Sequence, residues 1–496
     1  MEISLDLILL TPDEMAAADA QAAHSGLSSF GPMERAGQAV AAAALRYFPG
    51  ALRFAVLCGP GNNGGDGYIA AQALADSGAS VAVFHLGDPD KLQGDARQAR
   101  IACSAVSRSL ELYLPESGDV VIDALFGAGL SREVPQVVSD VIGKVTDDNV
   151  PVLAVDLPSG VCGRRGVPLG SAFRAQHTVT FMALKPGHLL LPGRSLCGDT
   201  EVFDIGIPRR IICSVAGKIR RNEPLLWRNL LPEPGSDTHK YRRGHLAVFS
   251  GSGSKTGAAR LSAAAGLKAG AGLVTVASPG DAIQVNASSL TAIMLHRIDR
   301  LEDLQSWLQA AKLSAFVLGP GFGVGEKARD FALAFQDRPL VLDADGITSF
   351  MEKPGELFDA FASGEPHLVL TPHEGEFARL FPDIAADKQL SKVEKAVKAA
   401  ERAHAAIVYK GADTVIASPD GRAYINANGP PWLATAGSGD VLAGMIGALL
   451  AQGVPAFEAA AAGVYLHGEA GHRAGRGMTA EDLAAHAGTG LGGSQP

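Results

Sequence analysis

The chain has 496 residues, which is enough for two or three domains with large buried cores and excludes a single small module. Its 43 basic and 52 acidic residues give a net charge of −9, so no basic surface for nucleic acid is expected. Hydrophobic residues make up 47% of the chain and charged residues 19%, a balance that favours compact α/β domains over disordered or coiled-coil classes.

The first half of the chain alternates short apolar or β-branched runs with helical stretches. Near its start, residues 11–14 (TPDE) have the sequence of a capping box and open an alanine-rich helix. Alternation of this kind predicts a parallel sheet covered by helices on both faces. The predicted strands of this half are residues 53–58, 81–85, 120–122, 152–155 and 178–181.

The first predicted strand runs into the segment 59–67 (GPGNNGGDG) and then into a predicted helix. The segment contains G-x-G-x-x-G, which by itself is a weak sign of dinucleotide binding. Asn62, Asn63 and Asp66 are more specific, because they place amide and carboxylate groups beside glycines at a helix N-terminus, where a ligand can touch the backbone. The alternative is a strand-to-helix turn with an Asp cap, which leaves the other special residues without a purpose.

Two further predicted strands end in polar segments, 123–132 (DALFGAGLSR) and 156–160 (DLPSG). Ligands of open parallel sheets bind at the carboxyl ends of the strands, so these segments and segment 59–67 are predicted to share one crevice. Asn63, Asp123 and Ser159 offer oxygen donors for a hard cation of low charge, whereas no His/Cys cluster is present for a transition metal. Taken singly, each Asp is as well explained as a helix cap.

Residues 215–243 break the apolar periodicity with three prolines, scattered charge and a Trp, which is typical of a linker. We therefore expect one domain over residues 1–215 and a second over residues 225–496.

Cellular location is predicted from hydropathy and cysteine usage. The longest apolar run, residues 441–451, is far shorter than the roughly 20 residues that span a bilayer, and Glu2 and Asp6 argue against a secretory signal. The five cysteines are widely spaced without a C-x-x-C pair, so reduced thiols and no zinc site are expected. The chain is predicted to be cytoplasmic, with no membrane partner.

The second half repeats the alternation of strands and helices but not the sequence of the first half. A second, different α/β domain is therefore expected rather than a duplication. Its predicted strands are residues 245–250, 273–277, 315–318, 340–342, 367–370 and 406–409.

A glycine-rich segment precedes the most apolar helix of the second half. Residues 434–444 (ATAGSGDVLAG) place small residues before Asp440, so that backbone N–H groups at the helix N-terminus can bind a transferring phosphoryl group while the carboxylate takes a proton from an attacking hydroxyl. Upstream, residues 410–414 (KGADT) end a strand and offer a cation and a hydroxyl to nucleotide phosphates.

Other strand ends of the second half are predicted to lie on the same rim. Residues 251–256 (GSGSKT) are not a Walker A loop, because Ser254 stands where that pattern requires Gly. The segments 318–323 (LGPGFG), 343–345 (DAD) and 371–376 (TPHEGE) each follow an apolar strand. His373 is a candidate for a substrate or phosphate contact, and a solvated loop histidine is the alternative.

The motifs CGPGNNGGDGYIAA, DALFGAGL, VDLPSG, KPG and DIGIP resemble the NAD(P)H-hydrate epimerases over residues 1–213. The resemblance implies a Rossmann-like three-layer α/β/α domain and a potassium ion held by Asn63, Asp123 and Ser159. It leaves open whether Asp156 or Asp66 is the acid and base that interconverts the R and S hydrates. The residues implied to contact the hydrated nucleotide are Asn62, Asn63, Gly64, Gly65, Asp66, Gly127, Ala128, Gly129, Leu130, Ser131, Arg132, Glu133 and Asp156.

The motifs SGSGSKTGAARLSAAAGLKAGAGLVTV, GPGFG, LDADG, TPHEGE, KGADT, TAGSGD and YLHGEAG resemble the NAD(P)H-hydrate dehydratases of the ribokinase-like superfamily over about residues 225–485. The resemblance implies an α/β/α domain that phosphorylates the S hydrate with ADP or ATP, helped by Asp440 and magnesium, and then eliminates phosphate. The implied contacts with the hydrate are Ala258, Gly321, His373 and Asp440. The implied contacts with the adenine nucleotide are Lys410, Gly411, Ala412, Asp413, Thr414 and Gly439.

Together the two resemblances predict a bifunctional enzyme that repairs hydrated NADH and NADPH, using ADP and releasing AMP and phosphate. A homo-oligomer is the default expectation for an apolar α/β enzyme of this size. Three alternatives were weighed: a ribokinase-like vitamin kinase with a nucleotide-binding first domain, a nucleotide sensor without turnover, and a nicotinamide-dependent dehydrogenase. The segment 59–67 argues against the first and the third, and intact Asp156 and Asp440 argue against the second.

Overall fold

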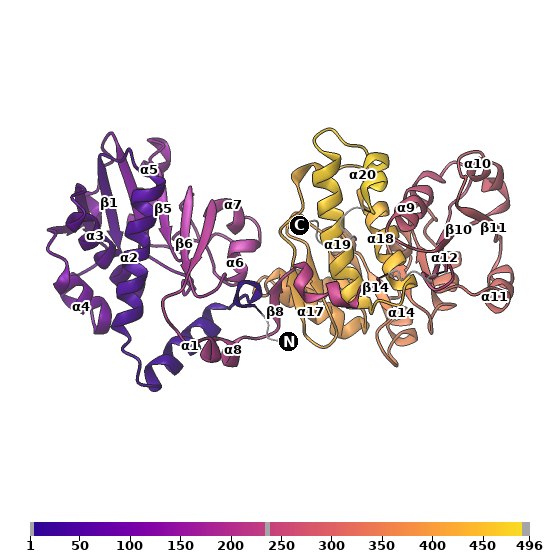
Figure 1. Cartoon of the computed structure of the whole chain (residues 1–496), viewed down its shortest axis with the longest axis horizontal. Helices are drawn as coiled ribbons and strands as arrows, with labels where there is room; N and C mark the ends of the chain where they lie inside the picture. Colours follow the sequence, from indigo (N-terminus) through magenta and orange to yellow (C-terminus); the bar gives the residue numbers. More distant parts are fainter. Residues whose placement is uncertain (1–3, 234–238, 489–496) are drawn as a thin grey trace. The chain divides into compact units, whose positions relative to one another are not determined.

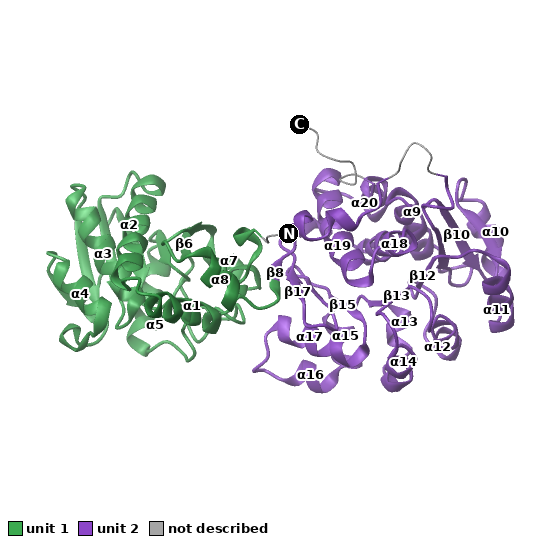
Figure 2. Cartoon of the chain, turned by 60° about the horizontal axis from the view of Figure 1, so that its bottom comes forward, with its two compact units in different colours: residues 1–219 green, residues 220–496 purple. Residues whose placement is uncertain are grey.

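The computed structural model describes residues 4–233 and 239–488, and the chain divides into two compact units, residues 1–219 (unit 1) and 220–496 (unit 2). Figure 2 shows the two units in different colours. The division falls inside the predicted linker. Residues 234–238 of that linker, and Glu2, lie outside the described residues.

Unit 1 is built on a seven-stranded sheet in the order β3-β2-β1-β4-β5-β6-β7, in which all neighbours are parallel (Figure 1). The strand order reverses between β1 and β4, and such a reversal opens a crevice at the carboxyl ends of these two strands. The strands are β1 (Arg53–Cys58), β2 (Val81–His85), β3 (Ser107–Ser109), β4 (Asp119–Ala124), β5 (Val152–Val155), β6 (His177–Phe181) and β7 (Asp199–Phe203).

The five strands predicted for this half are present, and β3 and β7 are additional. Both are edge strands with polar or charged residues, so pairing with a neighbour rather than apolar pattern makes them strands. Strand β4 is longer than predicted and contains Asp123, which was expected in the loop after it.

Helices cover both faces of this sheet. Successive residues of β1 point to opposite faces of the sheet, so Val56 packs with α2, α3 and α4 while Leu57 packs with α5. The capping box expected at residues 11–14 begins α1. The helices are α1 (Pro12–His24), α2 (Phe30–Tyr47), α3 (Asn62–Asp76), α4 (Gly94–Ala102), α5 (Gln136–Asp147), α6 (Pro186–Leu189), α7 (Gly193–Cys197) and α8 (Arg209–Val215).

Unit 2 contains the larger sheet, in the order β11-β10-β9-β12-β13-β14-β15-β16-β17-β8. Neighbours from β11 to β15 are parallel, and β16 and β17 then continue antiparallel. Its strands are β8 (Ile219–Arg221), β9 (His245–Phe249), β10 (Leu273–Ser278), β11 (Met294–Arg297), β12 (Ala315–Leu318), β13 (Leu340–Leu342), β14 (Leu368–Leu370), β15 (Ala406–Tyr409), β16 (Val415–Ala417) and β17 (Ala423–Ile425).

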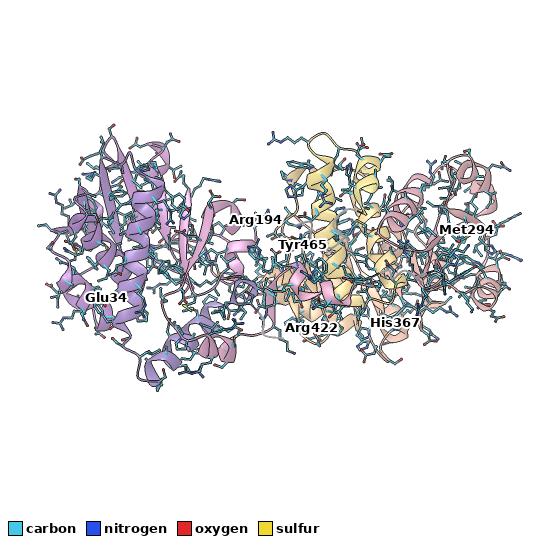
Figure 3. All side chains as sticks on the ribbon, in the orientation of Figure 1. Glu34, Arg194, Met294, His367, Arg422 and Tyr465 are labelled. Carbon is cyan, nitrogen blue, oxygen red and sulfur yellow. The ribbon has the colours of Figure 1, made fainter. Side chains whose placement is uncertain are left out.

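The six strands predicted for this half are present within one residue of the expected bounds, while β8, β11, β16 and β17 were not predicted. Strand β8 corrects the interpretation of residues 215–243 as only a linker, because the edge of the sheet beside β17 recruits three of them. Arg422, labelled in Figure 3, lies in the turn between β16 and β17 and joins it to α19 through Glu458 Oε1, 2.5 Å away.

One face of this sheet packs against α9, α18, α19 and α20 in an aliphatic core, and the other carries aromatic pairs such as Phe249 with Phe331 of α12. In the part of the chain that the structure describes, no helix has the length and apolar character needed to cross a membrane. The helices are α9 (Gly257–Lys268), α10 (Ile283–Ala287), α11 (Leu301–Ala310), α12 (Glu326–Leu333), α13 (Asp345–Thr348), α14 (Pro354–Ala360), α15 (Glu374–Leu380), α16 (Pro382–Ala386), α17 (Lys392–Ala403), α18 (Ser438–Ala451), α19 (Ala456–Ala474) and α20 (Ala480–His486).

Candidate active sites

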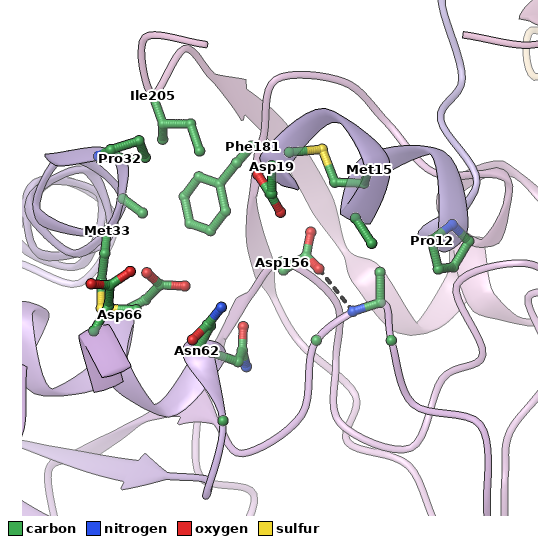
Figure 4. A pocket seen from close by; sticks show the side chains of 18 of the residues that line it. Pro12, Met15, Asp19, Pro32, Met33, Asn62, Asp66, Asp156, Phe181 and Ile205 are labelled. Carbon is green, nitrogen blue, oxygen red and sulfur yellow. Dashed lines mark hydrogen bonds between the residues drawn. The ribbon is translucent and has the colours of Figure 1, made fainter. Parts of the chain in front are cut away.

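A cavity of about 750 Å³ lies at the carboxyl ends of β1, β4 and β5 in unit 1 (Figure 4). Its polar walls come from the first turn of α3, from the segment after β4 and from the segment after β5, as the sequence predicts for one shared crevice. Its apolar walls include Met15, Met33, Phe181 and Ile205. A cavity with apolar walls and a few converging polar groups is typical of a small-molecule site.

Asp156 is the most strongly held carboxylate of this cavity. Its Oδ1 atom lies 2.7 Å from Lys185 Nζ and accepts a hydrogen bond from Thr180 Oγ1 at 2.9 Å, while its Oδ2 accepts one from the Ala128 backbone N–H at 2.8 Å. Burial alone would raise the pKa of Asp156, but the charge of Lys185 outweighs it and lowers the pKa to about 2. Asp156 therefore carries a fixed negative charge at neutral pH.

Two other carboxylates of the cavity have the opposite electrostatics. Burial raises the pKa of Asp66 well above its usual range, and the negative charges of Asp156 and Asp19 raise it further. Burial likewise raises the pKa of Asp19 to about 6, against the lowering effect of Lys185. Carboxyl groups whose pKa values are pushed apart within one cavity can divide acid and base roles between them.

Of the predicted cation ligands, Asp123 and Ser159 contact each other outside the lining set of the cavity, whereas Asn63 lines it. Asp123 is completely buried, and its carboxylate accepts hydrogen bonds from Ser159 N and Ser159 Oγ, both at 2.6 Å. Burial raises the pKa of Asp123 to about 6. A single buried carboxylate beside a hydroxyl oxygen fits a monovalent hard cation, which would relieve the cost of burying that charge.

Most of the predicted hydrate contacts line the cavity, and three do not. Gly64 and Gly65 lie in the first turn of α3 but face protein atoms: a Cβ on Gly64 would lie 1.9 Å from the Gly59 carbonyl oxygen, and one on Gly65 would lie 2.6 Å from Met33 Sδ. Glu133 is exposed and outside the lining set. The predicted residues that line the cavity are Asn62, Asn63, Asp66, Gly127, Ala128, Gly129, Leu130, Ser131, Arg132 and Asp156.

In unit 2, Asp440 lies in the first turn of α18, three residues after the cap residue Gly437, whose φ of +85° favours glycine. Burial raises the pKa of Asp440 to about 6, and the charge of Asp343 adds to this while Lys410 opposes it. A carboxylate with a pKa near 6 beside open backbone N–H groups of a helix N-terminus suits proton removal from a hydroxyl that attacks phosphorus.

Lys410 lies at the end of β15 and its Nζ atom is 2.8 Å from Asp343 Oδ1. Thr371 Oγ1 donates to the same Asp343 oxygen at 2.7 Å. Lys410, which is predicted to contact the nucleotide, therefore also holds Asp343 in place and lowers the pKa of Asp440.

The other predicted nucleotide contacts after β15 are partly committed to local structure. Asp413 Oδ1 lies 2.6 Å from Lys392 Nζ, and Thr414 Oγ1 donates to the Gly411 carbonyl oxygen at 2.7 Å. Gly439 lies near Lys410, since a Cβ built on Gly439 would be 3.4 Å from Lys410 Nζ. Ala412 lies between these groups in the same turn.

The predicted hydrate contacts of unit 2 lie at the carboxyl ends of neighbouring strands. A Cβ on Gly321, after β12, would be 3.4 Å from Ala258 Cβ at the start of α9. His373 is the N-cap of α15, and its Nδ1 atom accepts hydrogen bonds from the backbone N–H groups of Gly375 and Glu376. His373 is thus a helix cap whose side chain is 56% exposed, so both a ligand contact and a solvated histidine fit its position.

Four residues of these sites had no predicted role. Lys185 and Asp343 belong to the motifs KPG and LDADG, which carry the family resemblance. The motifs did not predict the ion pairs that these two residues form. His467 is buried on α19 and its Nε2 lies 3.0 Å from the Ser438 carbonyl oxygen behind the α18 N-terminus. Asp19 lies in the alanine-rich helix α1, far along the chain from the other acidic residues of the cavity. No sequence motif indicates a role for it.

Both halves match known families. Residues 32–187 match the family model described as YjeF-related protein N-terminus, and residues 246–489 match the model described as NAD(P)H-hydrate dehydratase. Similar proteins that match over most of both chains carry the name bifunctional NAD(P)H-hydrate repair enzyme Nnr. The one from Thermofilum pendens is 39% identical over 88% of this chain and 86% of its own, and the one from Coxiella burnetii is 35% identical over 94% and 95%.

The chain belongs to the family of bifunctional NAD(P)H-hydrate repair enzymes.

The resemblances drawn from the motifs of both halves are thereby confirmed at the level of the family. Among solved structures, the ADP/ATP-dependent NAD(P)H-hydrate dehydratase from Bacillus subtilis, co-crystallised with ATP/Mg²⁺, is 27% identical over 54% of this chain and 95% of its own, with a TM-score of 0.44. The α/β architecture of both halves of the chain is also as predicted.

Proposed function

We propose that this chain repairs hydrated NADH and NADPH, with unit 1 interconverting the R and S hydrates and unit 2 dehydrating the S hydrate. The observation that carries the proposal is the presence, in one chain of this family, of two separate sets of acidic residues at sheet carboxyl ends. One set surrounds Asp156 and Asp66, and the other surrounds Asp440.

The epimerase step is assigned to the carboxylates of the cavity in unit 1. The carbon that bears the hydroxyl also bears the ring nitrogen, whose lone pair can displace the hydroxyl and leave a cationic ring. The fixed charge of Asp156 stabilises that cation, and the protonated Asp66 supplies a proton to the departing hydroxyl. Of the two carboxylates that the sequence leaves open, we assign Asp66 as the acid and Asp156 as the electrostatic partner.

Potassium is proposed to bind at Asn63, Asp123 and Ser159. Bound there, it would supply a fixed positive charge that neutralises the buried Asp123 and holds the segments after β4 and β5 in place. Ser159 Oγ accepts a hydrogen bond from Phe126 N, so an ion held there would help to position the segment after β4, whose Ala128 N donates to Asp156.

The dehydratase step is assigned to the α18 N-terminus. The hydroxyl oxygen of the S hydrate attacks the terminal phosphorus of ADP, its proton passes to Asp440, and AMP leaves. The phosphate ester then loses phosphate with its bonding electrons and a proton from the adjacent ring carbon, which restores the dihydronicotinamide. Phosphate is a far better leaving group than hydroxide, which explains the use of a kinase-like unit.

Magnesium and the choice between ADP and ATP belong to the same proposal. Among the described residues no cluster of three acidic, His or Cys side chains could hold a metal ion. We propose that magnesium is bound mainly by the nucleotide phosphates. It would neutralise negative charge on the phosphoryl group that is transferred. A cytoplasmic homo-oligomer is proposed as the working form, and light scattering measures its subunit number.

The test follows dihydronicotinamide absorbance after the protein meets mixed R and S NADH hydrates with ADP or with ATP. We expect recovery of both epimers faster than their spontaneous interconversion. Asp440→Asn should abolish recovery, and Asp66→Asn should limit it to the S hydrate. No recovery with either nucleotide would refute the proposal and favour a small-molecule kinase.

A further inference from the structure

Helix α1 forms one wall of the cavity in unit 1, although it lies outside residues 32–187 that match the family model. Asp19 is the one charged residue among the α1 side chains that line the cavity; the rest are Pro12, Met15, Ala16, Ala22 and Ala23. Figure 4 shows Asp19 on one helix and Asp66 on another, with Asp156 drawn close to Asp19.

Asp19 has no evident structural task. Within the described residues its carboxylate makes no hydrogen bond or close ion pair, whereas Glu14 of the same helix accepts from Thr11 N at 2.7 Å and from Gly217 N at 2.8 Å. The Asp19 residue is exposed at the cavity, which leaves its carboxylate open to water and to a ligand. An unpaired carboxylate that lines a cavity and has a raised pKa is a candidate for function.

The groups that face Asp19 are of both signs. Lys185 attracts its charge, and Asp156 repels it. Asp66 lies near enough that the charge of Asp19 raises the pKa of Asp66. The charge of Asp19 therefore acts on Asp66 within one cavity.

We propose that Asp19 is a second catalytic residue of the epimerase, exchanging a proton with water on the face of the nicotinamide ring opposite the face served by Asp66. This inference rests on the proposed epimerase function of unit 1. It is argued from the position of the two carboxylates, which line one cavity from separate helices, α1 and α3.

The protons balance over one inversion. Protonated Asp66 gives its proton to the hydroxyl, the carbon–oxygen bond breaks, and water leaves one face while the ring nitrogen takes up the positive charge. A water molecule then adds to the other face, forming a new carbon–oxygen bond and passing a proton to ionised Asp19. The cavity ends with Asp19 protonated and Asp66 ionised, which is the state needed to invert the opposite epimer.

The burial that raises the pKa of Asp19 to about 6 supports this exchange, because a group that gains and loses a proton in every turnover works best with a pKa near neutrality. Asp156 does not share this property, since Lys185 keeps it ionised.

The experiment measures epimerisation rates of the full chain from each pure hydrate, with dehydration of the S hydrate by unit 2 as an internal standard. The variants are Asp19→Ala, Asp19→Glu and Asp19→Asn. Asp13→Asn is the matched control, because it removes the same charge from the same helix outside the cavity. We expect Asp19→Ala and Asp19→Asn to lower kcat about 100-fold or more with little change in KM. Formate should restore part of the rate of Asp19→Ala.

Several results would overturn the inference. One is an Asp19→Ala rate within threefold of the wild type. Another is a loss confined to KM, and a third is a loss of kcat that neither formate nor Asp19→Glu restores, which would mark a structural residue. A wild-type chain that does not epimerise would instead refute the proposed function, and the two failures are thus distinct.

Discussion

Lys185 Nζ contacts three oxygens at once: Asp156 Oδ1 at 2.7 Å, Thr180 Oγ1 at 2.8 Å and the Phe181 carbonyl oxygen at 3.3 Å. The Lys185 side chain is only 2% exposed, so its charge is compensated almost entirely by Asp156. This buried pair fixes the charge of the carboxylate at the centre of the cavity and holds the segments after β5 and β6 together.

Replacing Lys185 by Met is expected to raise the pKa of Asp156 from about 2 and to destabilise unit 1 by about 3–5 kcal/mol near neutral pH. The folded pKa of Asp156 lies below its ordinary value of 3.8, so the pair stabilises the fold above that value and is lost as the pH falls toward 2. Urea unfolding at pH 7 and at pH 3 measures this, with a smaller difference between variant and wild type at pH 3. An equal difference at both pH values would contradict the assignment.

The pH dependence of dehydration should report Asp440. Because its carboxyl has a pKa of about 6 and acts when ionised, kcat/KM is expected to rise with pH through about 6. Lys410→Met removes the cation that lowers this pKa, so the rise should move to higher pH. Lys398→Met, an exposed lysine on α17, is the control and should leave the profile unchanged. A profile unmoved by Lys410→Met would contradict the proposed coupling.

Potassium is expected to stabilise unit 1. At a concentration 100 times the dissociation constant, an ion that binds only the folded state adds about 2.7 kcal/mol, or roughly 5–10 °C in Tm for a domain of this size. Calorimetry in potassium chloride and in choline chloride of equal ionic strength measures the difference. Asp123→Asn should remove the potassium-dependent part, and persistence of the full shift in that variant would place the ion elsewhere.

Gly444 should tolerate no side chain. A Cβ there would lie 2.0 Å from the Ser262 carbonyl oxygen, so Gly444→Ala forces α18 away from α9 and is expected to cost about 1–3 kcal/mol in the unfolding of unit 2. Dehydratase activity should fall with it, because Ser262 Oγ donates to the Asp440 carbonyl oxygen at 2.6 Å. Gly355→Ala, which meets open space, is the control. Equal stability of the two variants would refute this packing argument.

The sequence predicted much of the fold because its strands are short, apolar and separated by helices. The eleven predicted strands are all present, and the strand-end rule correctly predicts that Asn63 and Asp156 line one crevice, whereas Asp123 lies within β4 outside its lining. The parts that were missed, β3, β7, β8, β11, β16 and β17, are short strands that exist through pairing with a neighbour, which one-dimensional patterns do not record.

What the sequence determined by itself is the alternation that builds two parallel sheets, and the glycine and acidic motifs at the ends of their strands. The tertiary structure alone decided how those acids differ. Lys185 lies 29 residues after Asp156 yet lowers its pKa, and Lys410 lies 67 residues after Asp343 yet binds it. Asp19 reaches the cavity only because α1 packs over it. Charge and burial depend on distances in space, and folding sets those distances between residues that the sequence keeps far apart.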